Sequence, residues 1–290
     1  MRSSTTKAVL VALLLAGCGS GSNPVPPAPA APASTPPAAP EPDEPTGPVV
    51  LAVDFDTTPL GPYTREALEA DWPGTEWVTL EPDRTEIIEG PPAFSGRSLR
   101  HKFAGGTRLH GHSLQVRVAL GGSYEDLYVR YRLRFGEGFD FVKGGKLPGL
   151  FGGEGNTGGG VPDGTDGWSG RMMWREDGAA TQYLYHPDQP GTFGQYFYWN
   201  RYFEPGVWHT VKMRFTMNTP GMHDGTLETW FDGAEAMRRG GLRFRDVDSF
   251  AIDGFDLVTF FGGGTNDWNA SKDEYIYFDD FVIWAEPIRQ

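Results

Sequence analysis

The chain has 290 residues, with 38 acidic and 25 basic side chains and a formal net charge of −13. A surface this acidic argues against nucleic acid or an anionic lipid surface as the main partner, although locally clustered basic residues could still bind a polyanion. The single cysteine excludes an intrachain disulfide, so a folded domain must be stabilised by its core or by a metal.

Residues 1–17 follow the order of a secretory signal peptide. Arg2 and Lys7 provide a basic start, and an apolar run at residues 8–15 follows. This run is far shorter than the roughly 20 apolar residues that span a bilayer, so it does not predict a transmembrane helix. The sequence LAGC, which ends at Cys18, resembles the lipobox of bacterial lipoproteins. The resemblance implies cleavage before Cys18 and lipidation of that cysteine; an ordinary signal followed by a chance cysteine is the alternative.

Residues 18–48 consist mainly of Pro, Ala, Ser and Gly. Such a segment buries too little apolar surface to fold, so we expect a disordered tether behind the lipidated cysteine. Gly19 stands where an aspartate would, by the same resemblance, favour retention at the inner membrane, so the outer membrane is expected. Residues 49–290 have a length usual for one β-sandwich or barrel, and we expect a monomer anchored only by its lipid.

Short runs of alternating apolar and polar residues dominate the rest of the chain, separated by frequent Gly and Pro. Residues 65–71 (REALEAD) predict one short helix, capped by the hydroxyl of Thr64. Many strands and few helices predict an all-β fold, an antiparallel sandwich of jelly-roll type. The strand candidates are residues 99–103, 114–120, 129–135, 211–215, 227–231, 258–261 and 275–284.

Two of these strands carry basic residues on one face: Arg130, Arg132 and Arg134 on the first, Lys212 and Arg214 on the second. Charged strand positions usually form a solvated outer face, which is the interpretation we favour. The alternative is that some of them line a groove for an acidic polymer.

Unusual features concentrate between residues 139 and 191. The motif KGGKLPGL (143–150) places two glycines before Lys146, which permits positive φ and close backbone approach. A glycine-rich stretch (152–167) follows and predicts either a mobile lid or an ordinary surface loop. It is not a phosphate-binding loop, because the required strand, Gly-Lys-Ser/Thr motif and helix are missing from its surroundings.

A hairpin is expected next, and its register decides which side chains meet. Glu176-Asp177-Gly178 suits a three-residue loop, a type I turn with Gly178 in the left-handed bulge position. Residues 175 and 179 then pair, so Arg171 lies opposite Tyr183 and Ser169 lies opposite Tyr185. All four side chains share one face, whereas a two-residue Asp-Gly turn would scatter them over both faces.

The motifs KGGKLPGL, WSGRMMWRED, YLYHP, MNTPGMHDG and FFGGGTNDW resemble polysaccharide lyase family 14, the alginate and glucuronan lyases. The resemblance covers roughly residues 127–284 and is looser up to about residue 124, including residues 108–112, which leaves the far wall of the site open. It implies a β-jelly roll with a concave substrate cleft that cleaves an acidic uronate polymer by β-elimination. The family's functional residues fall on Lys146, Ser169, Arg171, Tyr183 and Tyr185.

These residue types suit that reaction, because removing the C5 proton places a second negative charge beside a carboxylate. Arg171 is the expected carboxylate clamp, and Ser169 adds a hydrogen bond. Lys146 and Tyr185 are assigned to proton transfer, with Tyr183 positioning the substrate or sharing that role. Neighbouring cations are expected to lower the pKa of a tyrosine, and desolvation beside Arg171 to lower that of Lys146.

Four further residues are candidates for substrate binding: Lys143, Trp174, Arg175 and His186. Lys143 and Arg175 would add to the positive field that attracts a polyanion. Tryptophans in strands are more often core than sugar platforms, which is the competing interpretation for Trp174. His186 precedes a proline, and its alternative role is to cap a turn.

No histidine spacing in the chain predicts a zinc site, and no cofactor is expected. The carboxylates of Asp54, Asp56, Asp279 and Asp280 could form a structural calcium site, because calcium prefers oxygen ligands.

Two rival functions remain open. A non-catalytic carbohydrate-binding protein could share the fold, but it would not need two phenols beside an arginine and a lysine. A glycoside hydrolase needs two carboxylic acids that face each other, and Glu154, Glu176 and Asp177 have no convincing partner.

Overall fold

The computed structural model describes residues 44–81, 83–108 and 113–285. The expected signal peptide, Cys18 and most of the expected tether lie outside the described residues. Among the described residues, no helix has the length and apolar character needed to cross a membrane.

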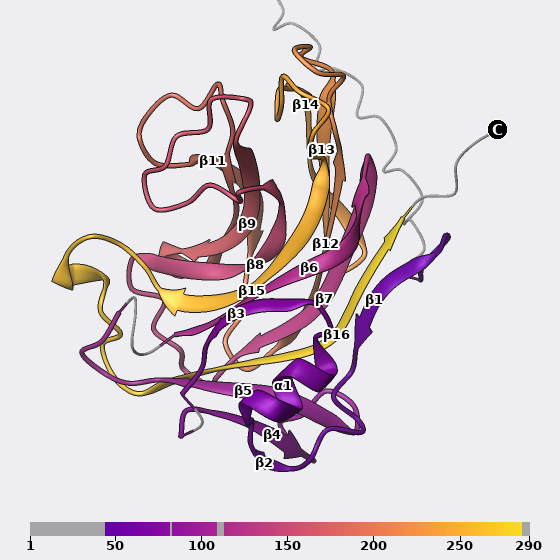
Figure 1. Cartoon of the computed structure of the whole chain (residues 1–290). Coiled ribbons are helices and arrows are strands. Elements are labelled where there is room, and N and C mark those ends of the chain that lie inside the picture. Colours follow the sequence, from indigo (N-terminus) through magenta and orange to yellow (C-terminus); the bar gives the residue numbers. More distant parts are fainter. Residues whose placement is uncertain (1–43, 82, 109–112, 286–290) are drawn as a thin grey trace, which may run out of the picture. The chain divides into compact units, whose positions relative to one another are not determined.

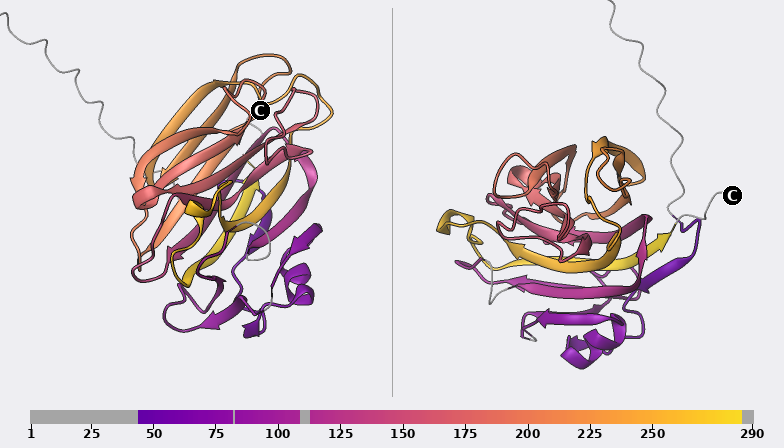
Figure 2. Two further views of the ribbon diagram at one scale, coloured as in Figure 1. Left: turned by 90° about the vertical axis from the view of Figure 1, so that its left-hand side faces the viewer. Right: turned by 45° about the horizontal axis from the view of Figure 1, so that its top comes forward.

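Two antiparallel sheets make up the fold (Figure 1). The first, which we call the β7 sheet, has the order β14 (Ala234–Leu242), β13 (Gly225–Phe231), β12 (Trp208–Thr216), β7 (Asp126–Phe135), β16 (Glu274–Ala285), β5 (Arg97–Phe103), β4 (Thr85–Glu89) and β2 (Gly61–Pro62), and β1 (Val49–Val53) also pairs with β16. The second, the β9 sheet, has the order β11 (Gln195–Tyr202), β10 (Ala179–Tyr185), β9 (Gly167–Arg175), β8 (Gly144–Gly153), β15 (Ile252–Phe261), β6 (Leu114–Tyr124) and β3 (Thr75–Thr79). The predicted antiparallel jelly-roll sandwich is confirmed (Figure 2).

The core lies between the two sheets and follows directly from the alternation of the strands. In β7, Leu127, Val129, Tyr131, Leu133 and Phe135 are fully buried against the other sheet. Such burial stabilises a fold by about 25 cal/mol per Å² of apolar area. Every strand predicted from the sequence contributes to one of the two sheets, so the period-two pattern identified them correctly.

The described part of the chain contains one short α-helix, α1 (Arg65–Asp71), as predicted. The hydroxyl of Thr64 accepts a hydrogen bond from the backbone nitrogen of Ala67 at 3.2 Å, which satisfies one of the free N–H groups of the first turn. Leu68 anchors the helix in the core. Two single 3₁₀ turns occur as well, η1 (Glu176–Gly178) and η2 (Asn266–Trp268).

The basic residues of β7 and β12 lie on the face of the β7 sheet that points away from the core, because their neighbours of opposite parity are core residues. The expectation that this face is solvated is wrong, since Arg130 is 5% exposed and Lys212 is 2% exposed. Lys212 lies 4.3 Å from the ring centroid of Trp230. Arg132 and Arg214 pair with the carboxylates of Asp280 and Asp126. Lys212, Arg132 and Arg214 therefore belong to an aromatic and ion-paired surface.

Candidate active site

A cavity of about 760 Å³, which we call the cleft, lies on the face of the β9 sheet that points away from the core. Side chains of β8, β9 and β10 form part of its lining: Lys146, Arg171, Tyr183 and Tyr185. Their strand neighbours of opposite parity, such as Met172 and Leu184, point into the core. The remaining lining comes from β6, β11 and β15 and from loop residues 157–158, 190–194, 262–264 and Trp268.

The hairpin between β9 and β10 brings the candidate residues together. Arg171 pairs with Tyr183 and Ser169 pairs with Tyr185, so the predicted register is confirmed. The turn itself differs in part from the prediction. Gly178 has the expected positive φ of 78°, but Asp177 also adopts a left-handed conformation, with φ 58° and ψ 19°. The loop length, and not the type I geometry, therefore fixed the register.

The two glycines before Lys146 have separate roles. Gly144 has φ 126°, which disfavours any other residue. A Cβ atom at Gly145 would lie 2.1 Å from the ring of Trp174, so only glycine lets this indole pack beneath β8. Together they fix the strand so that Lys146 points into the cleft.

The Lys146 amine is held among apolar groups and other cations. Its Nζ lies 3.2 Å from the sulfur of Met173 and 4.3 Å from the ring centroid of Tyr183. Among the described residues, no carboxylate forms an ion pair with it. Burial, reinforced by Arg171 and Arg175, lowers the pKa of Lys146 well below the ordinary 10.5, as predicted. The surroundings of Lys146 therefore favour the neutral amine, which is the form that can accept a proton.

Arg171 is 6% exposed and lines the cleft, yet its Nε has no hydrogen-bond partner among the described residues. Burial lowers the pKa of Arg171, and the nearby carboxylate of Asp256 partly offsets that effect. The Asp256 carboxylate itself binds Arg117, with an Nε–Oδ1 distance of 3.0 Å. A buried guanidinium with unused donors is costly unless an anion binds it.

The two tyrosines form a hydrogen-bonded pair, with 3.3 Å between their hydroxyl oxygens. Burial, followed by the hydrogen bond to Tyr185, raises the pKa of Tyr183 far above its ordinary value. The expected lowering of a tyrosine pKa by Arg171 is thus wrong for Tyr183, because desolvation outweighs the cation. Tyr183 remains a neutral phenol that can donate a proton.

The glycine-rich segment after β8 covers one side of the cleft. The backbone N–H of Gly159 donates to the hydroxyl of Tyr185 at 3.2 Å, and the hydroxyl of Ser169 donates to the carbonyl of Asn156 at 2.6 Å. Ser169 is completely buried and does not line the cleft. In this arrangement its hydroxyl holds the loop, whereas the sequence interpretation assigned it to the substrate carboxylate.

Two of the additional binding candidates remain near the cleft. Arg175 lies between two rings that line it, 4.9 Å from the centroids of both Tyr196 and Trp268. Lys143 does not line the cleft; it forms an ion pair with Asp267, next to Trp268. Lys143 therefore fixes the segment that carries the tryptophan.

The other two candidates are corrected by the structure. Trp174 is fully buried in the core and donates its indole N–H to the carbonyl of Phe141 at 3.2 Å, so it cannot contact a sugar. His186 is also buried and does not line the cleft. Its Nε2 binds the side-chain oxygen of Gln195, and its carbonyl accepts the N–H of Gln189. The alternative interpretation, a turn before the proline, is the correct one for His186.

Several lining residues were not predicted from the sequence: Gln115, Phe193, Tyr196, Phe260 and Trp268. Met173, which contacts Lys146, was also missed, although it shares the parity of Arg171. Trp268 belongs to the motif FFGGGTNDW, but nothing in that motif indicates that its tryptophan lines the cleft.

Among the described residues, the cleft has neither a pair of carboxylic acids nor a cluster of metal ligands. None of the described residues that line it is a carboxylate, so the pair of acids that a glycosidase needs is missing there. In the described part of the chain, no three His, Cys, Asp or Glu groups come close enough to hold a metal. The four aspartates suggested for calcium bind elsewhere: for example, Asp279 accepts from Ser98 at 2.6 Å, and burial raises its pKa to about 7.

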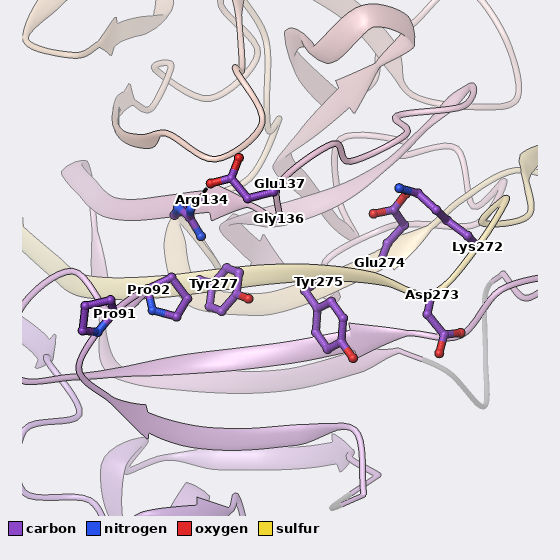
Figure 3. A pocket seen from close by; sticks show the side chains of 10 residues that line it. All are labelled: Pro91, Pro92, Arg134, Gly136, Glu137, Lys272, Asp273, Glu274, Tyr275 and Tyr277. Atoms are coloured by element: carbon purple, nitrogen blue, oxygen red, sulfur yellow. Dashed lines mark hydrogen bonds and ion pairs between the residues drawn. The ribbon is translucent and has the colours of Figure 1, made fainter.

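A second cavity, of about 550 Å³, lies over β16 and is shown in Figure 3. Its cations are already neutralised by neighbouring acids. Arg134 binds Glu137 at 2.7 Å, and Lys272 lies 3.7 Å from Glu274. It therefore lacks the unpaired positive charge that distinguishes the cleft.

Comparison with known proteins identifies the family. The family model described as polysaccharide lyase 14 matches residues 95–281. This match starts well before residue 127, where the resemblance in the sequence became clear, and includes β5 and β6. None of the curated proteins matches the chain.

Solved structures share the fold over most of the chain. Alginate lyase Aly36B is 24% identical, with a TM-score of 0.72, and the match covers 83% of this chain and 98% of that one. The PL-14 alginate lyase of Aplysia kurodai is 26% identical, with a TM-score of 0.70, over 82% of this chain and 100% of that one. The endo-β-1,4-glucuronan lyase of Trichoderma reesei is more distant, at 15% identity and a TM-score of 0.53, over 74% and 92% of the two chains.

Proposed function

The chain belongs to polysaccharide lyase family 14, and from this premise we propose that it cleaves a polymer of uronic acid residues by β-elimination. Solved structures that share its fold include enzymes described as alginate lyases and as a glucuronan lyase. A polymer of either type carries one carboxylate on each sugar, so it is a polyanion.

The observation that carries this proposal is the buried guanidinium of Arg171 in the cleft. Among the described residues, its Nε has no hydrogen-bond partner and no carboxylate lines the cleft. Retaining a buried cation in this way costs folding stability, which is expected where the missing anion is the substrate.

In the proposed mechanism, Arg171 binds the carboxylate of the sugar whose C5 proton is removed. A guanidinium presents parallel donors to both carboxylate oxygens and remains charged at any relevant pH. As the proton leaves C5, negative charge spreads into the carboxylate. The same contact then becomes stronger in the transition state, which is the condition for catalysis.

The shifted pKa values suggest which groups move the protons. Lys146, with its lowered pKa, takes the C5 proton as a neutral amine, and the C–H electron pair forms the C4=C5 double bond. The C4–O bond breaks, and the leaving oxygen takes a proton from Tyr183, whose pKa is raised. When the surroundings shift the pKa values of two neighbouring groups in opposite directions, one group commonly acts as the base and the other as the acid, here Lys146 and Tyr183.

Tyr185 and Ser169, the other two residues that match the family's functional positions, would act through the groups they contact. Tyr185 holds the hydroxyl of Tyr183 and is itself held by Gly159. Ser169 fixes the loop at Asn156. Both would thus position the groups that react.

The test is an assay of the purified chain on alginate, on glucuronan and on a neutral β-1,4-glucan. We expect ultraviolet absorbance to rise with at least one of the uronate polymers, because elimination leaves a double bond conjugated to the carboxylate. The rate should fall as the salt concentration is raised. Dissolved ions screen the attraction between the cleft and the polyanion, and the screening length is about 10 Å at 0.1 M salt. Binding to a uronate polymer without any absorbance change would contradict the lyase and support the carbohydrate-binding alternative.

We further propose that the enzyme is exported and anchored through lipid on Cys18, with residues 18–48 as a tether. The support is the sequence pattern alone, namely a short apolar run that ends in LAGC. The expected result is that the expressed full chain fractionates with membranes, whereas Cys18→Ser moves it to the soluble fraction. A Cys18→Ser protein that stays in the membrane fraction would contradict the lipid anchor.

A further inference from the structure

Strand β11 forms one edge of the β9 sheet (Figure 1) and exposes a row of tyrosines. Tyr196 and Tyr198 are 38% and 53% exposed, and Tyr202, at the end of the strand beyond a register shift, is 61% exposed. Single exposed aromatic residues such as Tyr202 are common, but two that alternate on one strand beside a cavity indicate a binding surface.

The register places these rings on the same face as the cleft. Tyr196 pairs with Tyr183, and Tyr198 pairs with Thr181. Residues directly opposite in an antiparallel pair point to the same side of the sheet. Tyr196 lines the cleft and stacks on Tyr183, with 5.0 Å between the ring centroids.

Tyr198 also ends the cross-strand row that contains Lys146. Lys146 pairs with Met173, Met173 with Thr181, and Thr181 with Tyr198. Three strand spacings separate Lys146 from Tyr198, which is about 14 Å at the usual spacing of about 4.8 Å. A sugar chain that crosses the strands at Lys146 would therefore reach this ring.

A cation accompanies the rings. The guanidinium of Arg175 lies 4.9 Å from the centroid of Tyr196, and among the described residues no carboxylate forms an ion pair with it. A uronate residue has both an apolar C–H face and a carboxylate. A tyrosine ring can stack on the first, and the charge of a nearby guanidinium attracts the second.

We infer that Tyr198, with Tyr196 and Arg175, forms a binding subsite for a uronate residue of the polymer that lies away from the bond being broken. This inference rests on the proposed function, because it assumes a uronate polymer in the cleft. The subsite holds long chains and has no contact with the shortest chains that can still be cleaved.

The test compares Tyr198→Ala with the wild type on polymer and on size-fractionated oligosaccharides of the same uronate. We expect KM for the polymer to rise about 3–10-fold, the usual worth of one aromatic contact, with kcat little changed. Both parameters should be unchanged on the shortest oligosaccharide that is cleaved. Tyr198→Trp should restore the wild-type KM, because it keeps a ring at this position.

Tyr202→Ala is the matched control, since Tyr202 is more exposed, lies on the same strand and pairs with Ala179, outside the row of Lys146. It should leave KM unchanged on all substrates. A Tyr198→Ala protein with equal losses on long and short chains, or with no loss on either, would overturn the subsite. Failure of the proposed function would be seen separately, as a wild-type protein that cleaves no uronate polymer.

Discussion

Replacing Lys146 with alanine is expected to lower kcat by about 10²–10⁴-fold, the usual contribution of a general base or acid. The amine is the one group in the proposed mechanism whose surroundings make it a neutral base, because burial, Arg171 and Arg175 all disfavour its charged form. Folding should be retained, since the substitution removes a desolvated amine that forms no ion pair with any carboxylate in the described part of the chain. KM should change far less than kcat.

The pH dependence gives a second readout for the same variant. A base must be unprotonated, so kcat/KM of the wild type should rise with pH through the pKa of Lys146. Because that pKa is lowered, the rise should occur well below the ordinary lysine value of 10.5. Lys146→Ala should lack this limb of the profile.

Lys143→Ala is the control for Lys146, because Lys143 is a nearby lysine that is half-exposed, paired with Asp267 and outside the lining of the cleft. It should keep activity within a few-fold of the wild type. A folded Lys146→Ala enzyme with near-normal kcat, or with the same pH limb, would remove Lys146 from the proton path and leave Tyr185 as the candidate base.

The sequence was most informative where a local rule sets the geometry. The alternation of β9 and β10, together with the three-residue loop Glu176–Gly178, was enough to place Arg171 opposite Tyr183. The same rule would have corrected one candidate. Trp174 has the opposite parity to Arg171 and Arg175, so it had to face the core, where the structure places it.

The parts that could not be predicted depend on contacts between distant segments. Trp268 reaches the cleft on a loop almost a hundred residues after Arg171, and no periodic pattern encodes that return. Burial is equally non-local. The sequence suggested that Arg171 would lower a tyrosine pKa, but the surroundings that desolvate Tyr183 come from several strands and raise it instead.

Replacing Arg171 with alanine should damage both binding and rate. Loss of a charge-assisted hydrogen bond of about 1.5–3 kcal/mol corresponds to a rise in KM of roughly 10–10²-fold. Loss of a preorganised donor to the developing charge should lower kcat by about 10²–10³-fold. Arg171→Lys should lie between alanine and the wild type, because it keeps the charge and loses the parallel donors. Steady-state kinetics on the polymer measure all three proteins.

Stability distinguishes this role from a structural one. Arg171 is buried, its Nε makes no hydrogen bond to any described residue, and Asp256 has its own partner in Arg117. Arg171→Ala should therefore unfold at the same denaturant concentration as the wild type or at a higher one, because it removes a buried charge that Asp256 offsets only in part. If the variant instead unfolds at a much lower concentration, Arg171 supports the fold and its loss of activity says nothing about the carboxylate. A stable but inactive variant would show that the wild-type protein keeps the buried charge of Arg171 at a cost to folding stability. The reason would be that the substrate carboxylate is the anion that pairs with Arg171.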